Sequence, residues 1–140
     1  MIDINTPILK AYYNAIDALG IPVYEGEEPD DVLDKIYVVI SDVSSNDVST
    51  KSSFDFNCNI QLSIHSWEYK YVNSSTLNTT VGQILQAIKP DVNSVFDLSA
   101  DGMQMTDLKL AQDITQRLGI LGERKFITRI LIFTQNIFII

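Results

Sequence analysis

The sequence from residue 54 to residue 64, FDFNCNIQLSI, alternates apolar and polar side chains without a break. Successive side chains of a β-strand point to opposite faces. This period of two therefore predicts a strand with one face in the core and the other face either exposed to solvent or packed against another surface. Cys58 lies on the apolar phase, and we expect it to be a small buried core residue. His65 lies on the other phase, so we expect it at the surface or at an interface.

A shorter apolar run precedes this strand. Residues 36–40 read IYVVI, all of them β-branched or aromatic. Five residues are too few for a buried helix, so we expect a strand covered on both faces. The polar residues 44–53 connect the two strands, which indicates one long β-hairpin over residues 36–67. This connection exceeds the roughly two to five residues usual in a hairpin, and long loops are often binding elements.

Two amphipathic helices lie on either side of the hairpin in the sequence. Over residues 6–19 apolar side chains recur at spacings of three and four, with Thr6-Pro7 as a start signal and Gly20 as a stop signal. A second apolar stripe runs from Leu77 to Ile88 and ends at Lys89-Pro90. Both patterns predict helices that bury one face.

The remaining segments suggest further strands separated by turns. Extended patterns occupy residues 23–24, 95–98, 103–114 and 125–133, with turns at 100–102 and 119–122. The expected order of elements is therefore α-β-β-β-α-β-β-β, with no repeat or linker that would divide the chain. We predict a single domain over residues 1–140 with an α+β fold, in which two α-helices pack on one face of an antiparallel β-sheet that includes the long hairpin.

Composition limits the classes of protein to which the chain can belong. It has 140 residues, of which 46% are hydrophobic and 20% charged, so it is globular and not disordered. A single cysteine allows no intramolecular disulfide and suits a reducing cytoplasm. The amino terminus has no basic n-region, and no apolar stretch is long enough to span a bilayer. We therefore expect a soluble protein with no membrane partner.

Acidic residues are concentrated at the beginning of the chain. The formal net charge is −8, and residues 1–34 hold eight acids and one lysine. Such a chain repels nucleic acids and anionic membranes, so it does not bind them non-specifically. The acids that follow the first helix form a candidate acidic surface: Glu25, Glu27, Glu28, Asp30, Asp31 and Asp34.

No pattern in the sequence indicates catalysis or a cofactor. The acidic loop does not match an EF-hand, since Gly26 is misplaced and the closing glutamate is absent. A catalytic His65 would need a nucleophile and an orienting carboxylate, and its neighbours Ser63 and Glu68 on one strand rarely hold that geometry. Cys58 is an odd number of residues from His65, so the two face opposite sides of the strand. We expect no catalytic residues, no metal site, no cofactor and no enzymatic activity.

The end of the chain is unusually apolar. Residues 137–140 read IFII, which would favour aggregation if they were exposed in a monomer. They either fold back as a sheet edge or are covered by a neighbouring subunit. We therefore name a candidate inter-subunit interface from the hairpin and this segment: Val48, Thr50, Lys51, Phe54, His65, Trp67, Phe138 and Ile140.

The order of these elements, together with several short motifs, resembles the tail-completion or tail-terminator proteins of long-tailed bacteriophages. The motifs are Tyr37-Val38-Val39-Ile40, then Ser49-Thr50-Lys51, then the alternating strand Ile60–Trp67, followed by a helix and two final strands. The resemblance spans most of the chain.

This resemblance implies a structural protein of the virion, assembled in the host bacterial cytoplasm. Proteins of this family form a ring, commonly of six subunits, at the head-proximal end of the tail tube. The ring ends tube polymerisation and joins the tail to the connector or stopper protein of the head, while double-stranded DNA passes through without specific binding. The acidic residues 25–34 are candidates for the wall of that channel.

Two other interpretations remain open. Another neck or head-completion protein of the same virion, such as a stopper or connector, would also form a ring. A small bacterial ligand-binding α+β domain would instead need a concave pocket with convergent polar groups.

Overall fold

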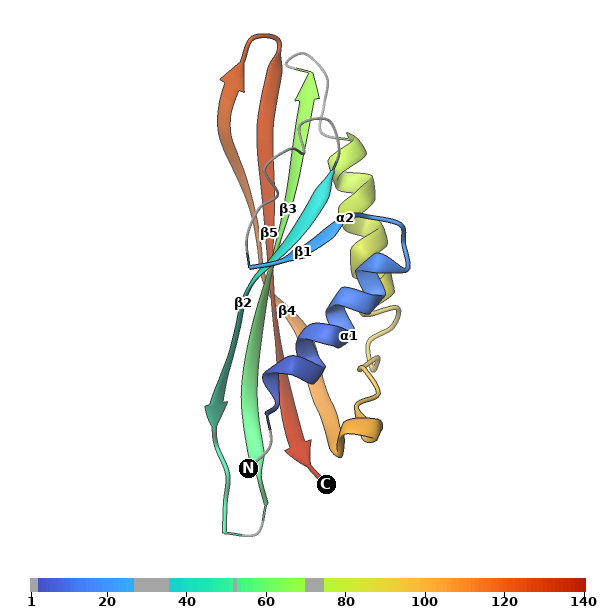
Figure 1. Cartoon of the computed structure of the whole chain (residues 1–140), viewed down its shortest axis with the longest axis vertical. Coiled ribbons are helices and arrows are strands. Elements are labelled where there is room, and N and C mark those ends of the chain that lie inside the picture. The colour runs from blue at the N-terminus through green and yellow to red at the C-terminus, as the bar shows by residue number, and fades with distance from the viewer. Residues whose placement is uncertain (1–2, 27–35, 52, 70–74) are drawn as a thin grey trace.

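The computed structural model of the chain describes residues 3–26, 36–51, 53–69 and 75–140. In these ranges five strands form one sheet, and two long helices lie on one of its faces (Figure 1). In chain order the elements are α1 (Asn5–Asp17), β1 (Val23–Glu25), β2 (Tyr37–Asp47), β3 (Asp55–Tyr69), α2 (Ser75–Ile88), the single 3₁₀ turn η1 (Ser99–Asp101), β4 (Met103–Leu121) and β5 (Arg124–Ile139). The fold is α+β, as expected.

The strands lie in the order β1-β2-β3-β5-β4. Each neighbouring pair is antiparallel except β1 and β2, which are parallel, so the sheet is mixed where we expected a purely antiparallel one.

The alternation in β3 sorts side chains as predicted. Its even-numbered residues from Phe56 to Ile64 are buried in the core on the side of the helices, and Cys58 among them is fully buried. Helix α1 packs Ile8, Tyr12 and Ile16 onto this layer, and α2 packs a similar stripe that includes Leu77 and Ile84. We call this side of the sheet the helix face and the other side the helix-free face.

Several expected boundaries are wrong. Strand β4 continues to Leu121, past its expected end at residue 114, so the turn expected at 119–122 lies at residues 122–123. Residues 95–98 are not a strand but an irregular loop that leads into η1. Residues 44–47 belong to β2, because their backbone pairs with residues 56–59 of β3, so the hairpin connection is shorter than expected. The last strand continues to Ile139 and lies between β3 and β4, in the middle of the sheet. The apolar carboxyl end is thus largely a central strand and not a sheet edge.

The molecule is elongated along its strands (Figure 1). The turn between β2 and β3 lies at one end of the long axis, near both termini, and the turn between β4 and β5 lies at the other end. Within the described residues no helix is long and apolar enough to cross a membrane.

Candidate assembly surfaces

Two stretches of sheet edge are open in the part of the chain that the structure describes. Strand β1 covers only residues Val38–Ile40 of β2, so Ser41–Asp47 has no neighbour on its outer side. Strand β4 forms the opposite edge over nineteen residues and exposes Leu110, Ile114 and Ile120. Long open edges with apolar side chains favour pairing with another chain.

Four predicted interface residues lie on neighbouring strands at the end of the β2–β3 hairpin. Val48, Phe54 and Ile140 are 53%, 57% and 81% exposed. The backbone N–H of Ile139 donates to the carbonyl of Phe54 at 3.0 Å, and Phe138 pairs with Asp55 in the neighbouring strand. We call Val48, Phe54, Phe138 and Ile140 the tip patch. Thr50 and Lys51 lie in the turn beside it.

Side-chain hydrogen bonds link the described residues on the two sides of this turn. The backbone N–H of Ser49 donates to Asp47 Oδ1 at 2.8 Å, and the N–H of Asp55 donates to Ser49 Oγ at 3.1 Å. The Ser53 hydroxyl donates to Asp55 Oδ2 at 2.9 Å and also bonds the Thr50 hydroxyl. The hydrogen bond from the Ser49 hydroxyl lowers the pKa of Asp47. Short polar side chains therefore build the turn locally and present Val48 and Phe54 to solvent.

The other two predicted interface residues lie elsewhere. His65 and Trp67 are at the far end of β3, roughly 40 Å from Phe54 at the usual rise per residue of a strand. His65 is only 6% exposed, which corrects its expected place on the surface. Its ring stacks on Phe126 with centroids 5.4 Å apart, lies against Tyr37, and its Nδ1 is 2.8 Å from the Thr128 hydroxyl. It is thus covered within its own chain.

The predicted acidic surface falls mostly outside the described residues. Glu25 is exposed at the end of β1. The other five members, Glu27, Glu28, Asp30, Asp31 and Asp34, lie in the range 27–35, which the structure does not describe. Their place relative to a channel stays a prediction.

The side chains with potential chemistry do not converge. Burial raises the pKa of the Cys58 thiol to about 11, which keeps it protonated and unreactive near neutral pH. Glu68 lies on the helix face, where it accepts the backbone N–H of Leu77 at 3.3 Å, whereas His65 lies on the helix-free face. Among residues 3–26, 36–51, 53–69 and 75–140, no three His, Cys, Asp or Glu side chains are grouped to hold a metal ion.

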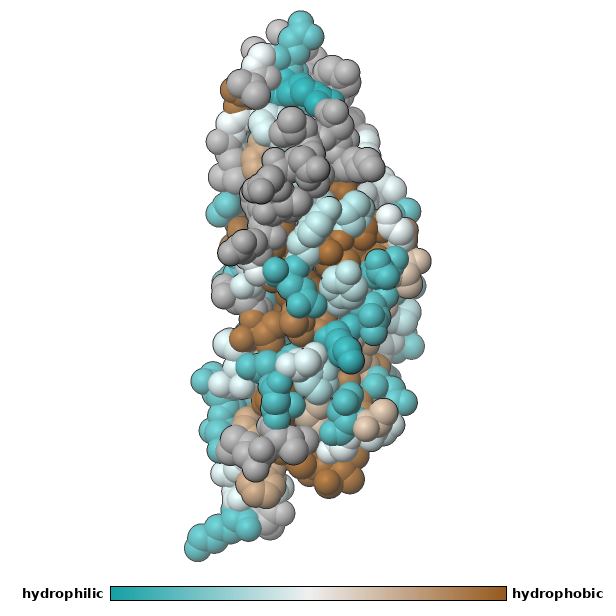
Figure 2. Space-filling view, viewed as in Figure 1, coloured by the Kyte–Doolittle hydropathy of each residue, from teal (hydrophilic) through white to brown (hydrophobic). Residues whose placement is uncertain are grey.

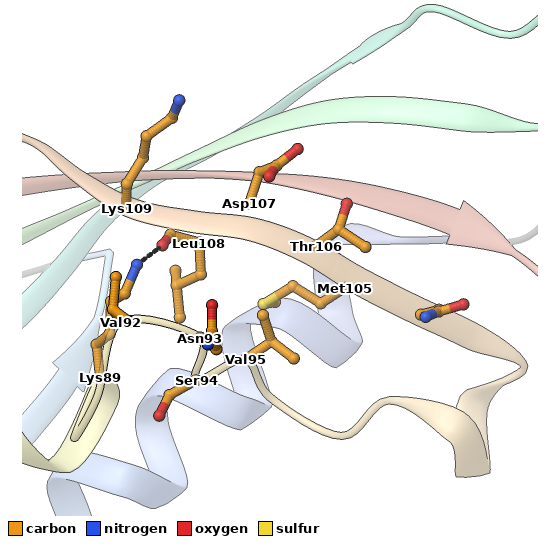
Figure 3. Close-up of a pocket in the computed structure, with 11 residues that line it drawn as sticks. Lys89, Val92, Asn93, Ser94, Val95, Met105, Thr106, Asp107, Leu108 and Lys109 are labelled. Atoms are coloured by element: carbon orange, nitrogen blue, oxygen red, sulfur yellow. Dashed lines mark hydrogen bonds between the residues drawn. The ribbon is translucent and has the colours of Figure 1, made fainter.

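Sequence patterns did not predict a groove that lies beside residues 104–109 of β4. One wall is the loop over residues 92–98 and the other is β4 from Gln104 to Lys109, as Figure 3 shows. This hollow has a volume of about 420 Å³ and adjoins a second one of about 360 Å³, which shares Val95, Gln104 and Met105 with it. We call the two together the β4 groove. It was missed because residues 95–98 read as a strand.

A hollow on the helix-free face shows how the sheet curves. Its volume is about 540 Å³, and four strands line it, from Ser44 on β2 across Gln61 and Ile132 to Gln112 on β4. Since β2 and β4 are not neighbours in the sheet, the face between them must be concave. The amide side chains of Asn46, Asn57, Asn59 and Asn136 line an adjoining hollow.

Apolar side chains also reach the surface over the helices. Figure 2 shows brown apolar patches among the polar residues of the face that it presents. Val92 and Val95, in the loop of the β4 groove, are exposed large apolar residues.

No protein-family model matches the chain, and no curated protein matches it. Among solved structures, it is similar to a chain described as "Virion of native gene transfer agent (GTA) particle". The two superpose with a TM-score of 0.67 and 15% sequence identity, over 92% of this chain and 92% of the other. At that identity the likeness shows a shared fold.

Proposed function

We propose that this protein is a structural subunit of a phage-like virion, and that it acts there as the tail terminator. In this role about six copies form a ring at the head-proximal end of the tail tube, which ends tube polymerisation. The ring joins the tube to the connector or stopper protein of the head, and DNA passes through it. The observation that carries the proposal is the likeness to the gene transfer agent virion chain over nearly the whole of both chains.

The two open edges suit a ring. A closed ring of identical subunits needs different, complementary surfaces on opposite sides of each subunit. The free part of β2 and the whole of β4 lie at opposite ends of the strand order and provide such a pair. Strand addition between them would cover the apolar side chains that β4 exposes.

The tip patch suits a contact along the ring axis. It lies at one end of the long axis of the subunit, whereas the open edges run along its sides (Figure 1). Its turn is shaped by its own hydrogen bonds, so little conformational entropy would be lost when a partner binds. We assign the tip patch to docking on the adjoining virion component, with the tail tube as its partner.

The proposal is tested in two steps on the full chain. Light scattering and negative-stain microscopy should show a ring near six times the 15.7 kDa chain mass, about 94 kDa. The ring should then shorten tubes when it is added to polymerising tail tube protein from the same genome. A ring that leaves tube length unchanged but binds the purified head connector would favour the neck-protein alternative. A protein that stays monomeric at all concentrations and in the presence of tubes would refute both.

A variant of the tip patch separates docking from ring formation. Phe54→Asp should leave the ring intact and abolish tube capping, because the exposed phenyl ring contributes to docking and not to the subunit core. Gln83→Asp, on the exposed side of α2, is the matched control and should cap normally. Unchanged capping by Phe54→Asp would remove the tip patch from the proposal.

A further inference from the structure

We infer that the β4 groove receives residues Ser41–Asp47 of strand β2 from a second copy of this chain. The inference rests on the proposed function, since it names the two surfaces through which neighbouring subunits of the ring would meet. It is argued from the backbone of β4, from the sheet register and from charge.

The backbone of β4 faces the groove at Leu108, within the bulge between Thr106 and Lys109. The Lys89 ammonium donates a hydrogen bond to the carbonyl oxygen of Leu108 (Figure 3). That carbonyl therefore points into the groove and away from β5, as the backbone of an edge strand does on its open side. Along the groove, the exposed Val92 and Val95 and the buried Met105 line the space that side chains of an added strand would enter. Strand addition uses this combination of backbone hydrogen bonds and side-chain pockets.

The free part of β2 lies at the same height in the sheet as the groove. One row of paired residues runs from Asp47 through Phe56 and Ile137 to Met105, and another runs from Val43 through Ile60 and Phe133 to Leu110. A subunit placed beside its neighbour with little offset would bring Ser41–Asp47 against this part of β4. Strands β2 and β4 run in opposite directions, so the new pair would be antiparallel.

The part of β4 around Ile114, beyond the groove, has no open stretch of β2 at the same level of the sheet. There Ile114 lies in a row with Ile130, Ser63 and Val39. Because β1 already pairs with β2 at Val38–Ile40, the edge of a second copy is covered at that level. The groove is thus matched to the stretch of β2 that is open among the described residues.

Charge favours the same pairing. The segment Ser41–Asp47 reads SDVSSND, with two aspartates and no base. The charged side chain that points into the groove is that of Lys89, whereas the side chains of Asp107 and Lys109 extend to the other side of β4 (Figure 3). The Lys89 ammonium, which donates to the Leu108 carbonyl, is the charged group that an incoming strand would approach in the groove. An acidic strand and the Lys89 ammonium in the groove attract each other, and two acidic β2 edges repel each other, which disfavours the pairing of two identical edges.

Engineered disulfides test the assignment. Ser44 on β2 and Gln104, Thr106 and Lys109 on β4 all lie on the helix-free face, since their rows contain odd-numbered residues of β3. Three double variants combine Ser44→Cys with Gln104→Cys, Thr106→Cys or Lys109→Cys. The two sites of each variant lie at opposite edges of one sheet, so a disulfide between them joins two chains. Cys58 is buried and does not compete.

On mild oxidation, at least one double variant should give a covalent ladder of dimers and higher species. The single variants should give at most dimers, and Ser44→Cys with Gln83→Cys on α2 should give no ladder. A ring of native mass without a ladder from any of the three variants would overturn the groove assignment and leave the ring standing. A ladder from a protein that never closes into a ring would overturn the ring and support the pairing.

Discussion

The buried hydroxyl of Tyr12 offers a sharp test of how the helix layer is attached to the sheet. It donates to Gln135 Oε1 at 2.6 Å, and Gln135 Nε2 donates in turn to the carbonyl of Cys58 at 3.2 Å. Tyr12 is fully buried and Gln135 nearly so. The substitution Tyr12→Phe therefore leaves the Gln135 carbonyl without its donor in a place that water does not reach, while ring packing against Phe96 and Phe133 is kept.

The expected loss of stability follows from the unpaired side-chain carbonyl of Gln135. A buried acceptor left without a partner costs about 1–3 kcal/mol, so we expect Tyr12→Phe to lower the free energy of unfolding by about 2 kcal/mol. With a urea m-value of about 2 kcal/mol/M, the midpoint falls by about 1 M. The double variant Tyr12→Phe/Gln135→Met removes both polar partners, so its loss should be smaller than the sum of the two single losses by about 1 kcal/mol or more.

Urea unfolding followed by circular dichroism measures these shifts at one fixed protein concentration, since assembly adds to apparent stability. Tyr13→Phe is the matched control, because Tyr13 is a neighbour on α1 that is only partly buried. Its hydroxyl has no hydrogen-bond partner in the described part of the chain. An equal midpoint for Tyr12→Phe and Tyr13→Phe would refute the reasoning, as would strict additivity in the double variant.

Burial also raises the pKa of Tyr12, which adds a dependence on pH. The unfolded chain loses this proton above its ordinary pKa of 10.0, whereas the folded chain retains it. Stability is therefore unaffected below that pH and falls as the pH rises beyond it. Tyr12→Phe should weaken this alkaline loss, and a loss as steep as in the native protein would show that other groups cause it.

Three further predictions concern stability and reactivity. Cys58 in the folded protein should react with a thiol reagent at least about 100-fold more slowly than in urea, because its pKa of about 11 lies two units above the ordinary 9.0; equal rates would contradict its burial. Asp113→Asn removes a paired salt bridge to Arg129 (2.6 and 2.7 Å) and should cost about 0.5–1 kcal/mol at pH 7. Hydrogen bonding to Arg129 lowers the pKa of Asp113, so this difference should fade as the pH falls below the ordinary 3.8, and a constant difference down to pH 2 would refute the cause. Leu62→Ala should cost about 2–5 kcal/mol in urea unfolding, since Leu62 is fully buried beneath the helices, and a loss below 1 kcal/mol would mean that the core collapses around the gap.

The sequence alone determined the parts of this protein that depend on local periodicity. Alternation over residues 54–64 predicted β3 and the burial of Cys58, and two helical stripes predicted α1 and α2. These patterns are readable because a strand or helix that covers a core must repeat its apolar side chains at its own period. The fold class followed from the order of those elements.

The neighbours of each strand were decided only by the tertiary structure. Local patterns do not say that β5 lies between β3 and β4, or that β1 runs parallel to β2. They placed His65 on the polar phase of its strand, and the sheet then covered it with Tyr37 and Phe126 from two other strands. Whether a side chain on a sheet is buried depends on the side chains that lie beside it on the adjacent strands.

The candidate assembly surfaces also differ in whether the sequence alone could predict them. The apolar residues of the tip patch and the polar turn beside it could be named from the sequence, because an apolar chain end and a polar turn are local features. The β4 groove could not be named, since it exists only where a loop after α2 lies beside an edge strand. Sheet edges arise from strand order, which contacts between residues distant in sequence determine. The surfaces through which this protein would assemble are therefore a property of its tertiary structure.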